Sequence, residues 1–254
     1  MGSPLDNAKA LYMEGIRDGD LRAVERFTGN RYTQHSSGIR SGTEGFIEFF
    51  EPFLERNPQR DIEIVRSVED GRYAFLHAYQ SLNDGAHRWV TMDLFDSDPQ
   101  GQIIEHWDVI QPFTETTSSG HGQVSGESEI QDLDQTDANK ERVLEFTKRV
   151  LQEGQTTLLP EFVAPNLIQH SPAMADGRQG LEAWLACGEG GDYEMLFRLI
   201  GQGNFVVTLG KRHRSGQDLA VFDIYRLQDG LLVEHWDTVE EILPRDQWGN
   251  SGKF

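Results

Sequence analysis

The sequence repeats itself, and this internal repeat limits the possible folds of the chain more than any other feature. Gln34-His35-Ser36 recurs 135 positions later as Gln169-His170-Ser171. Glu105-His106-Trp107-Asp108 recurs 129 positions later as Glu234-His235-Trp236-Asp237. A drift of a few residues between the two offsets is what small loop deletions in a duplicated domain produce. The sequence therefore predicts two copies of one domain.

The segment between the copies differs from both of them in composition. Residues 114–137 are rich in Ser, Thr, Gly, Gln and acidic residues and contain no Lys or Arg. This composition is typical of a flexible, self-repelling linker. We therefore expect one domain over 5–113, an acidic flexible linker over 114–137, a second domain over 138–246 and a polar tail over 247–254.

In each copy, the apolar residues first recur at helical spacing and then alternate with polar residues, as in strands. The helical segments are 7–18, 21–27 and a third beginning near Gly42, and in the second copy 139–153, 157–162 and a third beginning near Gly177. The alternating segments are 61–69, 73–81, 88–95 and 103–113, and then 194–200, 205–211, 219–227 and 231–242. This order predicts an α+β fold in which three N-terminal helices pack on a curved antiparallel sheet.

The charge balance makes some classes of binding partner unfavourable. Its 254 residues include 23 Lys and Arg against 42 Asp and Glu, a formal net charge of −19. Such a surface repels nucleic acid and anionic membranes, so neither is expected as a partner. Cys187 is the only cysteine, which makes an intrachain disulfide impossible, and we expect it to be a partly buried small hydrophobe. No signal or membrane-spanning segment stands out, so a cytoplasmic location is expected.

The last strand of each copy places polar side chains on one face and a tryptophan on the other. His106 and Asp108 share a face with Ile104 and Ile110, because side chains alternate along a strand. Both faces are partly apolar, so we expect both to be covered. One face would meet the helices of its own domain and the other, through Trp107 and Trp236, the sister domain. This predicts an intrachain pseudo-dimer.

A set of titratable side chains occurs twice and forms the candidate catalytic group. Burial on an apolar face raises the pKa of Asp and lowers that of His, which suits both for acid–base work near neutral pH. The alternative is a structural role, in which His106 and Asp108 satisfy each other and His35 caps a turn. The candidates are His35, Asp93, His106, Asp108, His170, Asp223, His235 and Asp237.

Other kinds of site fit the sequence less well. Two histidines with one or two aspartates could bind a metal, but they come from scattered elements and His106-x-Asp108 is not a recognised ligand spacing. No Gly-x-Ser-x-Gly elbow and no glycine-rich phosphate loop is found. The sequence therefore predicts no cofactor and no metal.

These motifs resemble the SnoaL-like proteins of the nuclear transport factor 2-like superfamily. The resemblance is carried by Gln169-His170-Ser171-Pro172, the helix opening at Gly177 and Gly180, Phe222-Asp223-Ile224-Tyr225-Arg226, and Gly230 followed by Glu234-His235-Trp236-Asp237. It covers nearly all of both halves and implies two tandem cone-shaped α+β barrels, each with a pocket between sheet and helices, paired through their sheets. Relatives include polyketide cyclases, ketosteroid isomerase, dehydratases and epoxide hydrolases, besides members that only bind ligands or proteins.

The resemblance also implies roles for individual residues. In the cyclases, an Asp resembling Asp108 and Asp237 is the general acid/base, assisted by a His on the preceding strand. Here that neighbouring position holds Asp93 and Asp223 instead. The second half keeps the family pattern better, whereas the first half has an additional phenol at Tyr32.

The leading interpretation is a cofactor-independent acid–base enzyme acting on a small carbonyl or hydroxylated organic molecule. It would catalyse isomerisation, dehydration or aldol-type cyclisation. His35 or His170 would move a proton together with Asp108 or Asp237. Three further residues would bind substrate: Tyr32, Gln34 and Gln169, the two glutamines donating to a developing oxyanion. The alternatives are a non-catalytic small-ligand-binding or assembly module and, third, a metal-dependent enzyme with His and Asp ligands. Further homo-oligomerisation stays open.

Overall fold

The computed structural model describes residues 2–188 and 190–254, which contacts divide into two compact units. Unit 1 contains the chain up to Pro112 together with Ile242–Phe254, and unit 2 is Phe113–Glu241. Each unit has helices and one five-stranded sheet, which confirms the predicted α+β class and the tandem repeat. The pairing of the units as a pseudo-dimer and the predicted domain boundaries stay predictions.

Unit 1 begins with helices and ends with strands, as the periodicity predicts. Its first helix follows Ser3, whose hydroxyl accepts a hydrogen bond from the backbone N–H of Asp6. The third helix follows Gly42, whose φ of 93° is favourable only for glycine. The elements are α1 (Pro4–Ala10), continued by η1 (Leu11–Arg17), α2 (Ala23–Phe27), β1 (Thr28–Gln34), α3 (Thr43–Arg56), β2 (Arg60–Asp70), β3 (Tyr73–Leu82), β4 (His87–Ser97) and β5 (Ile103–Pro112).

Unit 2 repeats this order. Its helical elements are η2 (Leu133–Gln135), α4 (Thr136–Phe146), η3 (Thr147–Gln152), η4 (Thr156–Leu158), α5 (Leu159–Phe162) and α6 (Gly177–Ala186). Its strands are β6 (Val163–Gln169), β7 (Asp192–Gln202), β8 (Phe205–Arg214), β9 (Gln217–Gln228) and β10 (Leu231–Glu241). A short turn of helix, η5 (Arg245–Gln247), follows in the C-terminal segment.

The two sheets have the same topology, with strand orders β1-β5-β4-β3-β2 and β6-β10-β9-β8-β7. The four predicted strands of each copy pair antiparallel, as expected, but a fifth strand was not predicted, and it pairs in parallel: β1 with β5, and β6 with β10. The first of these strands is hard to predict, since Thr28–Gln34 contains Gly29 and Asn30 and is rich in polar residues, which is typical of turns. The missed strands matter for the site, because Tyr32, Gln34 and Gln169 lie on them.

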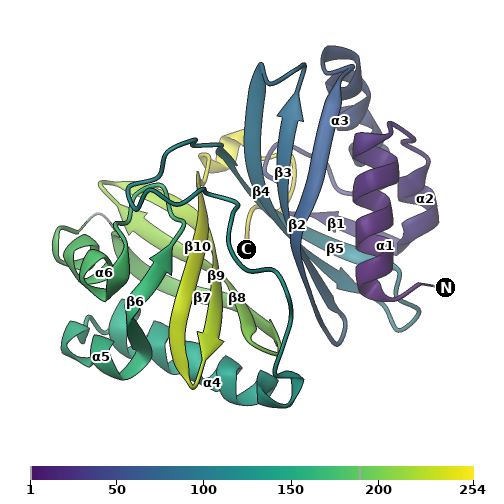
Figure 1. The fold of residues 1–254 in the computed structure, drawn as a ribbon. Coiled ribbons are helices and arrows are strands. Elements are labelled where there is room, and N and C mark those ends of the chain that lie inside the picture. The colour runs from purple at the N-terminus through teal and green to yellow at the C-terminus, as the bar shows by residue number, and fades with distance from the viewer. Residues whose placement is uncertain (1, 189) are drawn as a thin grey trace. The chain divides into compact units, whose positions relative to one another are not determined.

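The core of each unit lies between its helices and its sheet. In Figure 1, α1, α2 and α3 lie together on one side of the unit 1 sheet. Leu11, Ile16 and Phe46 from the helical side pack with Ala78 and Phe95 of the sheet. The corresponding core of unit 2 includes Phe146, Phe162, Trp184 and Tyr225. Burial of these side chains is the main force that holds helices and sheet together.

In both repeats, the segment that follows the last strand is part of the other unit. We call these segments the linker arm (113–131, after β5), which belongs to unit 2, and the C-terminal arm (242–254, after β10), which belongs to unit 1. The linker arm was expected to be flexible. Here it is held by hydrogen bonds to unit 2, for example from Ser119 Oγ to Gln169 O and from Trp236 Nε1 to Ser125 O.

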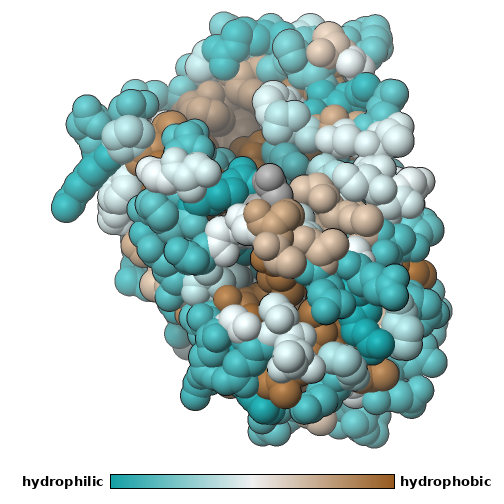
Figure 2. Space-filling view, turned by 90° about the vertical axis from the view of Figure 1, so that its left-hand side faces the viewer, coloured by the Kyte–Doolittle hydropathy of each residue, from teal (hydrophilic) through white to brown (hydrophobic). Residues whose placement is uncertain are grey.

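The surface agrees with the acidic, polar composition. Figure 2 shows one face, on which hydrophilic residues predominate and hydrophobic residues form smaller groups. Large exposed hydrophobic side chains include Phe49 and Ile110 of unit 1. In the part of the chain that the structure describes, no helix has the length and apolar character needed to span a membrane.

Candidate functional site

Unit 1 contains a cavity of about 330 Å³ between its helices and its sheet. The cavity is lined mostly by aliphatic and aromatic side chains, among them Leu11, Ile16, Phe46, Phe50, Phe53, Trp89, Phe95 and Ile110. Phe49 and Ile110 also line it and are 39% and 37% exposed, so this end of the cavity is open to solvent. Such a mainly apolar cavity with a few polar groups is the usual form of a small-molecule site.

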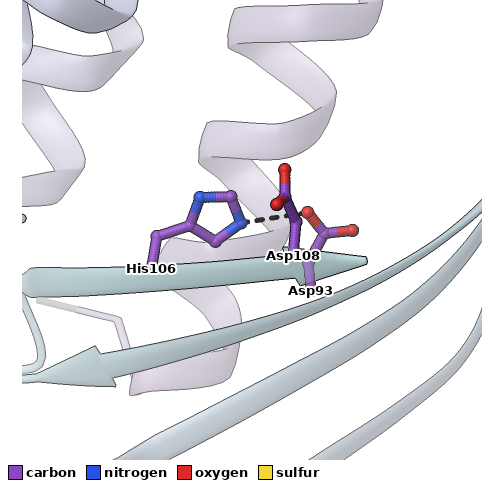
Figure 3. Close-up of side chains that lie close together, drawn as sticks. All are labelled: Asp93, His106 and Asp108. Atoms are coloured by element: carbon purple, nitrogen blue, oxygen red, sulfur yellow. Dashed lines mark hydrogen bonds and ion pairs between the residues drawn. The ribbon is translucent and has the colours of Figure 1, made fainter. Parts of the chain in front are cut away.

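Three titratable side chains meet at the floor of this cavity. Asp93 on β4 and Asp108 on β5 are direct partners in the antiparallel register, and His106 lies two residues before Asp108 on the same strand face. Figure 3 shows the imidazole of His106 directed at the two carboxyl groups, on the same side of the sheet. The structure thus brings together three of the predicted catalytic residues, all buried.

His106 shares a proton with Asp93. Its Nε2 lies 3.0 Å from Asp93 Oδ1, and its Nδ1 donates to Gln34 Oε1 at 2.9 Å. Because Nδ1 carries a hydrogen, the Nε2–Oδ1 contact holds one further proton, on either the imidazole or the carboxyl. Burial raises the pKa of Asp93 above its ordinary value, and the hydrogen bond from His106 offsets only part of this.

A chain of hydroxyl groups fixes the other oxygen of Asp93. Gln80 Nε2 donates to Tyr12 Oη (2.7 Å), which is 2.6 Å from Thr91 Oγ1, and Thr91 donates to Asp93 Oδ2 (2.8 Å). With Gln80 donating, the hydroxyl of Tyr12 donates to Thr91 in turn. Asp93 Oδ2 is therefore an acceptor, so the shared proton lies on the Oδ1 side, next to His106.

Asp108 has a different partner, the ammonium group of Lys253. Lys253 Nζ donates to Asp108 Oδ1 at 2.8 Å and to Asp108 O at 2.7 Å, and both side chains are buried. Burial alone would raise the pKa of Asp108, but the attraction of Lys253, assisted by His106, outweighs it and lowers this pKa. Asp108 is therefore a carboxylate at neutral pH.

Tyr32 supplies a hydroxyl to the cavity wall. Its oxygen accepts a hydrogen bond from Gln34 Nε2 at 2.9 Å, so its own hydrogen can be donated to a ligand. Burial, and then the charges of Asp108 and Asp93, raise the pKa of Tyr32, which keeps the phenol protonated. Gln34 was expected to donate to an oxyanion, but its two polar atoms bind Tyr32 and His106 instead.

His35 lies away from this group. It stacks on Trp107 with 4.8 Å between ring centroids, and its Nε2 lies 2.8 Å from Glu105 Oε1. Trp107 and Glu105 are on the face of β5 opposite to His106 and Asp108. The Nδ1 of His35 donates to Gly252 O of the C-terminal arm at 2.6 Å. These contacts give His35 a structural role, because its hydrogen bond to Gly252 holds the C-terminal arm.

The corresponding residues of unit 2 are arranged alike but enclose only about 20 Å³. His235 lies 2.8 Å from Gln169 Oε1 and 3.1 Å from Asp223 Oδ1. Asp237, the register partner of Asp223, is also buried. His170 lies on the opposite face, stacked on Trp236 with Nε2 2.8 Å from Glu234 Oε1 and Nδ1 2.7 Å from Gly122 O.

Arg212 and Trp184 occupy the space that is open in unit 1. Arg212 Nη2 lies 3.0 Å from Asp223 Oδ1, and its guanidinium carbon lies 5.2 Å from the ring centre of Trp184. By register, Arg212 corresponds to Gln80. Burial alone would raise the pKa of Asp223, but Arg212, with help from His235, lowers it. Burial, partly offset by His235, raises the pKa of Asp237.

Several of these residues were not predicted from the sequence. Thr91 could have been found, because it lies two residues before Asp93 on the same strand face. Tyr12 and Gln80 carried no signal of their own, and Lys253 lies in a tail described only as polar. Arg212 lies beside Lys211 and close to Arg214, so nothing in the sequence singles it out.

A metal site at Asp93, His106 and Asp108 was considered. One ligand atom from each lies within 4.8 Å of the others, a spacing that a metal site could use. However, the ammonium of Lys253 already neutralises Asp108 and would repel a further cation. We therefore do not treat these three residues as metal ligands.

Comparisons with known proteins each match part of the chain. Residues 10–106 match the model of the SnoaL-like domain. No curated protein sequence matches the chain. A candidate polyketide cyclase from Bacillus cereus is 17% identical, with 42% of this chain and 74% of that chain covered and a TM-score of 0.39. A candidate ketosteroid isomerase from Kribbella flavida is 15% identical, with 43% and 83% covered and a TM-score of 0.39.

A protein of unknown function from Burkholderia xenovorans, described as NTF-2 like, is 18% identical. The match covers 45% of this chain and 95% of that chain, with a TM-score of 0.38. Each of these matches extends over less than half of the chain. The match of residues 10–106 to the SnoaL-like domain agrees with the resemblance stated from the sequence motifs.

Proposed function

We propose that unit 1 is a cofactor-independent acid–base catalyst that acts on a small, mainly apolar carbonyl or hydroxylated compound. The observation that carries this proposal is a pair of carboxyl groups on adjacent strands, Asp93 and Asp108, which face one cavity but have different fixed partners. Two like groups whose environments shift their pKa values apart can serve as acid and base at the same pH. The reaction class is isomerisation, dehydration or aldol-type cyclisation.

Asp108 is the base in this proposal. Its ion pair with Lys253 keeps it ionised at neutral pH, so it can accept a proton from a carbon next to a carbonyl group. The electron pair of the broken C–H bond moves onto the carbonyl oxygen and gives an enolate. The proton on Asp108 can then return to a different carbon, which amounts to isomerisation.

Tyr32 and the Asp93–His106 pair act on the substrate oxygen. The hydroxyl of Tyr32 is positioned by Gln34 and donates to the developing oxyanion. The shared proton between Asp93 and His106 is available to neutralise the enolate or to protonate a leaving hydroxyl. His35, expected to be catalytic, has no part in this mechanism, because its partners are Glu105, Trp107 and the C-terminal arm.

The lining of the cavity favours a neutral, ring-containing substrate. Its wall is largely aromatic and aliphatic, and the polar side chains of its lining gather around Asp93, His106 and Asp108: Tyr12, Tyr32, Gln34, Ser36, Gln80 and Thr91. Apolar walls favour binding of an apolar ring, while a few polar groups fix its orientation. The net charge of the protein, −19, also disfavours anionic substrates.

Unit 2 is proposed as a non-catalytic scaffold. Arg212 neutralises Asp223 and, with Trp184, leaves about 20 Å³ of free space, too little for an organic substrate. The acid–base set is thus repeated in the sequence, whereas the space for a substrate is in unit 1. This division provides a matched control for the substitution of Asp108, because Asp237 occupies the same register position in unit 2.

Hydrogen exchange into a simple ketone tests the proposal without knowledge of the natural substrate. The protein is incubated in D₂O with 2-tetralone or cyclohexanone, and NMR records the loss of the C–H signals next to the carbonyl. We expect the wild type to accelerate exchange, Asp108→Asn to abolish the acceleration, and Tyr32→Phe to reduce it by about 10²-fold, the usual effect of losing one oxyanion donor. The matched control, Asp237→Asn, should exchange like the wild type.

Two results would contradict the proposal. One is exchange that survives in Asp108→Asn, and the other is an equal loss in Asp108→Asn and Asp237→Asn. Specific line broadening of the ketone without any exchange would instead favour a ligand-binding module, the alternative drawn from the sequence.

A further inference from the structure

The buried cation that contacts Asp108 comes from the C-terminal arm and not from the repeat that forms the site. Lys253 is 3% exposed, and its Nζ contacts both the carboxylate and the backbone oxygen of Asp108. Lysine is rarely buried to this extent unless its charge is paired. The residue therefore has a specific role at Asp108.

Several hydrogen bonds hold the C-terminal arm where Lys253 can reach Asp108. Gly249 N donates to Ser37 O at 2.8 Å, and Asn250 Nδ2 donates to Ser36 O at 2.5 Å and to Ile39 O at 2.8 Å. His35 donates to Gly252 O, one residue before the lysine. Ser36 and Ile39 themselves line the cavity, so the arm is anchored on the wall of the site.

The linker arm of unit 2 has the same anchor but lacks the cation. Gly122 O accepts from His170 as Gly252 O accepts from His35, and Ser118 N donates to Pro172 O much as Gly249 N donates to Ser37 O. The residue after Gly122 is Gln123, at the place of Lys253. The charge is therefore specific to the arm that belongs to the unit with the open cavity.

The groups around Asp108 explain why a fixed cation is needed there. From β5 and β4 it faces His106 and Asp93, and from β1 and η1 the phenols Tyr32 and Tyr12. Asp93 has a like charge when ionised, and both carboxyl groups are buried. Without Lys253, burial and repulsion would favour a proton shared by the pair, so that neither carboxyl was a dedicated base.

We propose that Lys253 is a positioning residue of the unit 1 site, which keeps Asp108 as the carboxylate that accepts the proton. This inference rests on the proposed function of unit 1. With this role of Lys253, the site is complete only when the C-terminal arm is docked. Lys253 acts through Asp108 and needs no contact with the substrate.

Titration of the Asp108 carboxyl in the full-length protein tests this directly and needs no substrate. The protein is labelled with ¹³C at the Asp carboxyl carbon, and the Asp108 signal is assigned by its loss in Asp108→Asn. We expect the midpoint of Asp108 to rise by about one pH unit or more in Lys253→Gln, the residue found in the linker arm, and in Lys253→Met. Lys253→Arg should restore the wild-type midpoint, and Lys211→Gln, at a surface ion pair of unit 2, should leave it unchanged.

The exchange assay gives the second readout. In Lys253→Gln, the pH at which ketone exchange is half-maximal should move upward together with the Asp108 midpoint, and Lys253→Arg should reverse both changes. An unchanged Asp108 midpoint in folded Lys253→Gln and Lys253→Met overturns the inference. A shifted midpoint in a protein that exchanges no ketone supports the role of Lys253 and contradicts only the proposed function.

Discussion

Asp93 and Asp108 lie opposite each other on neighbouring strands, yet their pKa values are shifted in opposite directions. Burial raises the pKa of Asp93, while Lys253 and His106 outweigh burial at Asp108 and lower its pKa. In unit 2 the pattern is reversed, since Arg212 lowers the pKa of Asp223 and burial raises that of Asp237. The position of one cation thus decides which carboxyl of the pair has the lowered pKa.

Asp93→Asn should stabilise the protein at neutral pH. A raised folded-state pKa means that the protonated carboxyl contributes stability below the unfolded-state pKa of about 3.9, and this is lost as the pH rises through the folded-state pKa. Asparagine can accept from Thr91 and donate to His106 as the protonated carboxyl does. Urea unfolding should give a higher free energy of unfolding than wild type at pH 7, by about 1.4 kcal/mol for each unit of pKa shift, and equal values near pH 3.

The control for this prediction is Asp61→Asn, at an exposed position of β2, which should change stability by less than about 0.5 kcal/mol at both pH values. A variant at Asp93 that loses stability at pH 7 would show that the ionised carboxylate is the form the fold requires.

Arg212→Gln should destabilise unit 2 strongly at neutral pH and weakly in acid. The change gives unit 2 the residue that unit 1 has at Gln80, and it leaves Asp223 buried without its cation, which typically costs about 3–5 kcal/mol. The lowered pKa of Asp223 contributes stability above its unfolded-state pKa, and this is lost as the pH falls through the folded-state value. The difference from wild type should therefore shrink towards pH 3 in denaturant unfolding.

A double variant separates charge from packing in that experiment. In an Asp223→Asn background, Arg212→Gln removes no ion pair, so its additional cost at pH 7 should be well below that of the single change. An equal cost in both backgrounds would mean that the packing of Arg212 against Trp184 matters more than its ion pair with Asp223.

His170→Ala should lower stability and leave the catalysis of unit 1 unchanged. The substitution removes the bonds to Glu234 and Gly122 and the stacking on Trp236, a loss of about 3 kcal/mol if each bond to a charged or buried partner counts about 1.5. The interpretation from the sequence predicts the reverse, lower turnover in a stable protein. Thermal unfolding and ketone exchange, measured on the same sample well below the melting temperature, distinguish the two.

The surface histidine His213, paired with Asp218, serves as the comparison, and His213→Ala should change stability by less than about 0.5 kcal/mol. Loss of exchange activity in folded His170→Ala would contradict the structural role.

The sequence predicted the repeat, the order of helices and strands, and the strand face that holds His106 and Asp108. These features depend on local periodicity, which a sequence carries directly. It assigned no strand to Thr28–Gln34, because a polar edge strand in parallel pairing has no alternation of its own to reveal it. It could not separate His35 from His106, since a shared motif does not say on which face of the sheet a residue after a strand will lie.

Two further features needed the three-dimensional structure. The motifs of the second half match the family pattern better, yet the open cavity is in unit 1, because space depends on residues outside the motifs such as Arg212 and Trp184. The partner of Asp108 is Lys253, 145 residues away along the chain. A contact of that separation leaves no trace in spacing or composition.

The exchange of arms has a consequence for how this chain arose from its duplicated domain. The segment after the last strand of each repeat covers the stacked His and Trp of the other repeat. A single repeat with one such segment would therefore need a second copy of itself to be covered in this way. Fusion of two repeats replaces that bimolecular encounter by a tethered one at high effective concentration. Once the two arms were encoded separately, selection could change Lys253 and Gln123 independently, and each unit could diverge through a residue encoded outside its own repeat.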